Sequence, residues 1–167
     1  MNILILTGLG EPHYCSNDSL IQGLRKLGHR VLACGPRYHF GPSSLELGDD
    51  FFFLEDKTFP EYYQFEDFWD KATELIDNEH FDFILQIEPH FYLTGPKPSD
   101  APPIAYYCID IHCGGEWYHR YIKAHEYLFD FILLGQPQFS YYFNDIKIPT
   151  YPMPLALDED DVLELLA

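Results

Sequence analysis

Short apolar runs alternate along the chain with segments whose apolar positions recur at helical spacing. Runs of strand length stand at 2–7, 30–34, 82–87, 104–109 and 130–134, with a shorter one, FFFL, at 51–54. Runs that are almost wholly apolar are typical of strands buried on both faces, as in a parallel sheet covered by helices. These six segments are therefore predicted to be strands.

Helical patterns fill most of the intervals between them. The first predicted helix begins at the N-capping residues of 16–18 and ends near Gly28, a residue type favoured just past a helix end. Its apolar face is expected to comprise Leu20, Ile21, Leu24 and Leu27. Further helices are predicted at 61–79, 117–127 and 137–145, and a last extended segment at 148–158. This alternation predicts an α/β fold, Rossmann-like and doubly wound, with a mostly parallel sheet and helices on both faces.

Two of the predicted strands share their letters. FDFILQIEPHF at 81–91 and FDFILLGQPQF at 129–139 have the same first five residues, followed by a proline and a phenylalanine at the same spacing. A remnant of duplication would explain this, and so would two strands in equivalent sheet environments. We prefer the second explanation.

Composition narrows the functional class. The 167 residues fit one domain, and 47% hydrophobic residues supply a core, while 10 basic against 27 acidic residues give a net charge of −17. Such a surface repels nucleic acids and anionic membranes. Four scattered cysteines without a C-x-x-C pair, no signal-peptide pattern and no apolar run long enough to span a bilayer lead us to expect a cytoplasmic protein.

Reactive side chains follow the carboxyl ends of several predicted strands. In open parallel sheets, ligands bind at that edge, where loops and helix N-termini converge. We expect one cleft lined by the residues after strands 2–7, 82–87, 104–109 and 130–134. The candidates are Gly8, Gly10, Glu11, His13, Glu88, His90, Asp110, His112, Cys113, Gly114, Gly115, Glu116 and Gln136.

These candidate residues are consistent with more than one kind of site. GLGEPH at 8–13 lacks the third glycine of a dinucleotide fingerprint, which argues against a dinucleotide site. The pairs Glu88-x-His90 and Asp110-x-His112 supply carboxylates and imidazoles, which can hold a divalent metal or orient a general base, and either pair can also cap a turn. No H-x-H or H-E-x-x-H motif accompanies them. We therefore expect no tightly bound metal.

With these residues identified, the chain resembles the N-terminal half of a GT-B glycosyltransferase, closest to the CgeB-like group of spore-maturation glycosyltransferases. The resemblance rests on the order of MNILILTGLG, LRKLGHRVLACGP, FDFILQIEP, PPIAYYCIDIH, YLFDFILLGQP and YPMPLALD, and covers nearly the whole chain. It implies an acceptor-side domain over 1–155, with 156–167 beginning a linker or C-terminal helix toward a second, donor-binding domain.

The resemblance also implies a function and partners. A sugar would pass from a nucleotide-sugar, as co-substrate and without other cofactor, to a sugar or glycan acceptor. In that function, His112, His90 or Asp110 would act as the base if the mechanism is inverting. By their place after the strands, Gly8, Gly10, Glu11, His13, Glu88, Gly114 and Gln136 would contact substrate. The second domain would act in cis or in trans, and the isolated chain would be inactive. Two other hypotheses stay open: an acidic protein-binding or scaffold domain, and a metal-dependent hydrolase built on the acid-x-His pairs.

Overall fold

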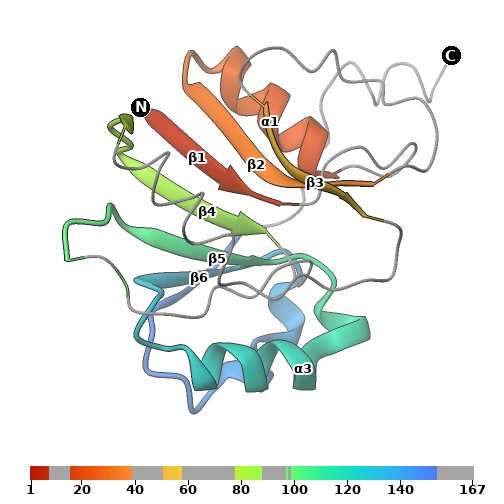
Figure 1. Cartoon of the computed structure of the whole chain (residues 1–167). Coiled ribbons are helices and arrows are strands. Elements are labelled where there is room, and N and C mark those ends of the chain that lie inside the picture. Colours follow the sequence, from red (N-terminus) through yellow and green to blue (C-terminus); the bar gives the residue numbers. More distant parts are fainter. Residues whose placement is uncertain (8–15, 39–50, 58–77, 88–96, 98, 154–167) are drawn as a thin grey trace, which may run out of the picture.

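The computed structural model describes residues 1–7, 16–38, 51–57, 78–87, 97 and 99–153 (Figure 1). Within them, seven strands form one sheet in the order β3-β2-β1-β4-β5-β6-β7, and every neighbouring pair is parallel. The strands are β1 Asn2–Leu6, β2 Arg30–Tyr38, β3 Phe51–Lys57, β4 Phe83–Ile87, β5 Ile104–Cys108, β6 Phe131–Leu134 and β7 Thr150–Pro152. The helices are α1 Ser16–Lys26, α3 Ile111–Ala124 and the 3-10 helix η1 Pro137–Phe143.

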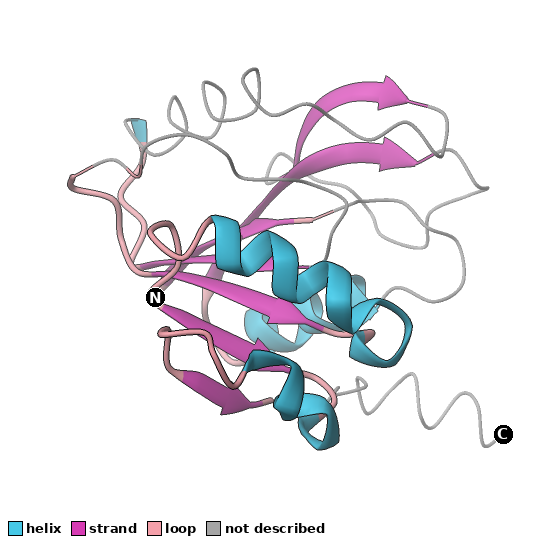
Figure 2. Cartoon of the chain, turned by 90° about the horizontal axis from the view of Figure 1, so that it is seen from below, coloured by secondary structure: helices cyan, strands magenta, loops and turns pink. Residues whose placement is uncertain are grey.

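The strand order reverses between β1 and β4, as it does in a doubly wound fold. Helix α1 covers one face of the sheet, and α3 covers the other (Figure 1). Seen from the α3 side, α3 and η1 lie in front of the strands (Figure 2). The predicted Rossmann-like α/β fold is confirmed.

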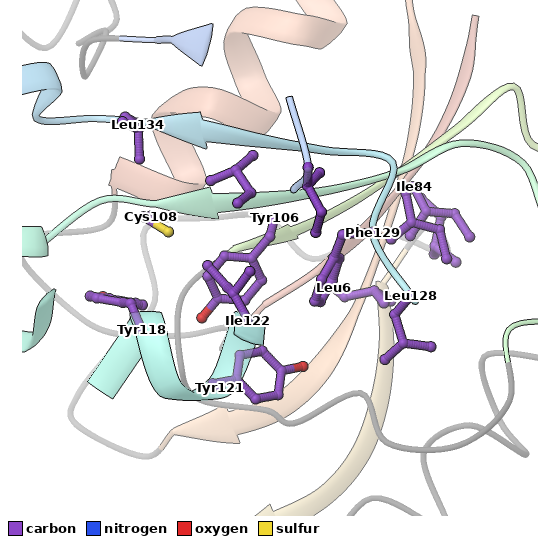
Figure 3. Packing of buried hydrophobic residues seen from close by; sticks show 14 of the residues in the cluster. Leu6, Ile84, Tyr106, Cys108, Tyr118, Tyr121, Ile122, Leu128, Phe129 and Leu134 are labelled. Atoms are coloured by element: carbon purple, nitrogen blue, oxygen red, sulfur yellow. The ribbon is translucent and has the colours of Figure 1, made fainter. Parts of the chain in front are cut away.

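Alternate residues of the strands belong to two hydrophobic clusters, one on each face of the sheet. Ile3 and Ile5 of β1 face α1, whereas Leu4 and Leu6 face the α3 side. On the α3 side, Tyr118 and Tyr121 project from the helix toward Tyr106 of β5 (Figure 3). Each fully buried large apolar side chain contributes about 1.5–3 kcal/mol. These clusters therefore fix both helices against the sheet.

Helix α1 ends at Lys26, and Gly28 stands just past that end as predicted, with a φ of 83° that suits glycine. The N–H of Gly28 donates to Arg25 O, and that of His29 donates to Leu24 O, which together form a Schellman motif. The expected apolar face is wrong at one position. Leu27 is 75% exposed, because the helix has already ended at Lys26 and the chain is turning away.

The two FDFIL segments occupy equivalent places in the sheet. The N–H of Asp82 donates to Asn2 O, and its carboxylate accepts the N–H of Asn2 at 2.7 Å. Asp130 makes the same two contacts with Ile104, again with 2.7 Å at the carboxylate. In each case, the aspartate pairs with the start of the neighbouring strand. The shared aspartate thus has the same role in both segments.

The phenylalanines that follow these aspartates also meet. The rings of Phe83 and Phe131 stack with centroids 5.5 Å apart, although β5 lies between their strands. Ala105 of β5 is the register partner of Phe131 and belongs to the same cluster. Its small side chain lets the two rings meet across it.

Several element boundaries differ from the sequence prediction. Helix α3 begins at Ile111 rather than Trp117 and ends at Ala124, and β2 and β3 run on to Tyr38 and Lys57 as paired partners. The segment expected to be helical at 137–145 is a 3-10 helix over 137–143, and the extended segment at 148–158 contains β7. Most of the expected helix 61–79 and residues 154–167 lie outside the described residues.

Candidate functional site

Strands β4, β5 and β6 end together at one side of the sheet, called here the carboxyl edge. The register pairs Ile87 with Tyr107 and Cys108 with Leu134, so the segments that follow β5 and β6 emerge side by side. This arrangement brings Asp110, His112 and Gln136 together. Six other candidates lie outside the described residues, and their placement stays a prediction: Gly8, Gly10, Glu11, His13, Glu88 and His90.

The N-terminus of α3 is capped from another part of the chain. Asp110 occupies the N-cap position and is exposed, but its side chain makes no capping hydrogen bond. Instead, the side-chain oxygen of Gln136 accepts the backbone N–H of His112 at 3.0 Å. A helix start leaves several N–H groups without intrahelical partners, and this bond satisfies one of them. Gln136 therefore fixes the beginning of α3 to the end of β6.

The same amide holds the imidazole of His112. Nδ1 of His112 lies 3.0 Å from Oε1 and 2.9 Å from Nε2 of Gln136. When Nδ1 carries the proton and donates it to Oε1, Nε2 has the lone pair that a general base needs. The ring of Phe139 lies beside the imidazole, with centroids 6.5 Å apart. His112 is exposed at the surface while its orientation is held.

The two glycines that follow have packing roles. Gly114 interrupts the helix with φ −136° and ψ 18°, and an added β-carbon there would lie 3.2 Å from the ring of Tyr118. At Gly115, an added β-carbon would lie 2.6 Å from the ring of Tyr142. Gly115 thus allows η1 to approach α3 closely. Substrate binding by Gly114 stays a prediction.

One face of α3 contacts η1 and the turn that follows it. His112, Gly115, His119 and Lys123 recur at helical spacing along this face. His119 Nε2 lies 2.7 Å from Asp145 Oδ1, and Lys123 Nζ donates to the backbone oxygen of Asp145. The sequence prediction missed these contacts. Placing the helix start at Ile111 would have revealed the spacing.

Charges at the far half of α3 form a local network. The hydrogen bond from His119 lowers the pKa of Asp145. The backbone N–H of Lys147, together with Lys123, lowers the pKa of Glu126, and the bond to Glu126 raises the pKa of Lys123. Arg120 lies 3.5 Å from Glu116. The two basic side chains of α3 thus both have acidic partners.

Comparison with protein-family models and with curated proteins finds no match for the chain. In the described part of the chain, no cluster of three or more His, Cys, Asp or Glu side chains is arranged to hold a metal ion. No helix among the described residues combines the length and apolar character needed to cross a membrane.

Proposed function

We propose that this chain is the acceptor-side domain of a GT-B glycosyltransferase, which passes a sugar from a nucleotide-sugar to an acceptor hydroxyl. A second domain, in cis or in trans, would bind the donor. The observation that carries this proposal is the exposed imidazole of His112, held by Gln136 at the carboxyl edge of a doubly wound sheet. Ligands of such sheets bind at this edge.

In this function, His112 Nε2 takes the proton of the acceptor hydroxyl as its oxygen attacks the anomeric carbon in an inverting reaction. The bond from that carbon to the nucleotide diphosphate breaks, and the diphosphate leaves with the electron pair. Gln136 keeps Nδ1 engaged, so that Nε2 faces the reaction with its lone pair. Asp110 and His90 are the other candidates for the base.

The acidic scaffold hypothesis is the alternative, and the charge of −17 supports it. It differs from the transferase in one respect that can be measured, because a scaffold does not depend on an imidazole at position 112. The hydrolase hypothesis needs Glu88 and His90 beside Asp110 and His112, and the first two lie outside the described residues.

The test uses the chain joined to the second domain that its reading frame or a co-expressed partner supplies. Transfer from UDP-glucose and GDP-mannose to neutral methyl glycosides is followed by mass spectrometry. Replacing His112 with Ala should lower the rate by about 10²–10⁴-fold, the usual contribution of a general base, without lowering the melting temperature.

The matched control is His80→Ala, because His80 is an exposed histidine at the opposite, amino end of the sheet. Its transfer rate should equal that of the unmodified protein. Full transfer by His112→Ala would exclude His112 as the base. Absence of transfer by the unmodified complete protein would favour the scaffold.

A further inference from the structure

A row of aromatic rings continues from His112 along η1. Successive ring centroids lie 6.5 Å apart from His112 to Phe139, 6.2 Å from Phe139 to Tyr141, and 4.5 Å from Tyr141 to Tyr142. The row therefore begins beside the proposed base at the carboxyl edge, and Phe139 links His112 to the two tyrosines.

The outer part of this row is open to solvent. Tyr141 is 56% exposed, and its ring stacks on that of Tyr142 at an interplanar angle of 30°. A tyrosine offers a flat apolar ring face with a polar hydroxyl at its tip. The two stacked tyrosines thus form an apolar surface bordered by their hydroxyl groups.

The row is also held in place before any ligand arrives. The ring of Tyr142 packs on Gly115, Pro137 starts η1, and Gln136 ties that start to α3. The His119 contact with Asp145 fixes the chain just beyond η1. A surface that is already ordered loses little conformational entropy when it binds a ligand.

We propose that Tyr141, supported by Tyr142, is a stacking platform for a pyranose ring of a neutral saccharide. A pyranose has an apolar face of C–H groups with hydroxyls around its rim, which matches a ring face bordered by polar groups. The charge of −17 and the pairing of Arg120 with Glu116 disfavour an anionic ligand here. Identifying this saccharide as the acceptor rests on the proposed function, because Phe139 connects the platform with His112.

Saturation-transfer NMR on the chain tests the platform, with methyl β-D-glucopyranoside and methyl β-D-galactopyranoside as probes. Saturation should reach the ring protons of one sugar face. Replacing Tyr141 with Ala should weaken binding about threefold to tenfold, the effect of losing one stacked ring. Tyr141→Phe keeps the ring face and loses only the hydroxyl at its border, so it should bind more tightly than Tyr141→Ala. Tyr127→Ala is the matched control, because Tyr127 is also 56% exposed but lies past the end of α3.

Two results would overturn the platform: no saturation transfer from either glycoside, or transfer that survives Tyr141→Ala. Self-association that disappears in Tyr141→Ala, without sugar binding, would identify a second copy of the chain as the occupant instead. The glycoside readout does not depend on turnover. If the chain binds the glycosides but the complete protein transfers no sugar, the platform is upheld and the transferase is refuted. If the complete protein transfers sugar and Tyr141→Ala has no effect on glycoside binding, the transferase is upheld and the platform is refuted.

Discussion

Tyr142 lies over Gly115 so closely that a β-carbon at position 115 would fall 2.6 Å from its Cε2 atom. Gly115→Ala should therefore push η1 away from α3 and destabilise the protein by about 1–3 kcal/mol, the usual effect of overpacking. Urea denaturation followed by circular dichroism measures this change.

Gly23→Ala is the matched control, because Gly23 also lies inside a helix and an added β-carbon there meets nothing within 4 Å. It should stabilise the protein by about 0.5–1 kcal/mol through helix propensity. When the ring is removed, the alanine at 115 should no longer destabilise the protein, so Gly115→Ala/Tyr142→Ala should be as stable as Tyr142→Ala alone. Equal effects of alanine at 23 and 115 would show that the close approach has no energetic consequence.

Gln136→Ala removes the oxygen that caps α3 and the partner of the His112 imidazole. We expect a loss of about 1 kcal/mol, as for other lost helix caps. Gln136→Glu keeps an oxygen acceptor, and its charge suits a helix N-terminus, so its stability should stay close to that of the unmodified protein. Thermal unfolding of the two variants distinguishes them, and a stable Gln136→Ala would mean that water replaces the cap.

Asp82→Ala and Asp130→Ala each remove a carboxylate that accepts the first N–H of a neighbouring strand. Each should lower the free energy of unfolding, because the strand's first N–H then loses its acceptor in the protein. The loss should be larger at Asp130, because its bond to Ile104 is partly buried, whereas the bond of Asp82 to Asn2 is exposed. Asparagine at either position should restore most of the stability, and a larger loss at Asp82 in chemical denaturation would contradict this ranking.

The Asp145 carboxyl should make stability depend on acid pH. Its pKa in the folded protein lies below the ordinary value of 3.8, because His119 bonds the ionised form. Folding therefore gains stability from Asp145 above that ordinary value, and the gain is lost as the pH falls through the lowered pKa. Asp145→Asn should be less stable than the unmodified protein near neutral pH, with the difference vanishing in strong acid. Urea titrations at several pH values test this, and a constant difference would refute it.

The described domain alone should bind nucleotide-sugars weakly. Diphosphates need cationic or helix-dipole partners, and the two basic side chains of α3 already pair with Glu116, Glu126 and Asp145. Calorimetry with UDP-glucose should give a dissociation constant no tighter than the millimolar range, about −4 kcal/mol. Micromolar binding would show that this domain carries a donor site of its own.

The parallel sheet could be predicted from sequence because its strands are apolar runs whose burial is a local property. The start of α3 could not, because it depends on contacts that are distant in sequence. From sequence alone, Asp110, His112 and the two glycines are typical of a loop. The structure shows that Gln136 caps the helix at His112 and that Gly115 makes room for the ring of Tyr142. The meeting of His112 with Gln136 was predictable, since it follows from parallel order alone. The hydrogen bonds between the two residues could not be predicted, because side-chain pairing depends on where each loop turns.

The interior position of β1, between β2 and β4, has a consequence for biosynthesis. Of the seven described strands, β1 is synthesised first, yet one of its two partners, β4, begins only at Phe83. At about 5–20 residues per second, synthesis makes β1 wait several seconds for that partner. During that time, one edge of an almost wholly apolar strand is open to water and to other nascent chains. A strand that lies inside the finished sheet is thus an open sheet edge while the chain is being made, and such edges are sites of aggregation.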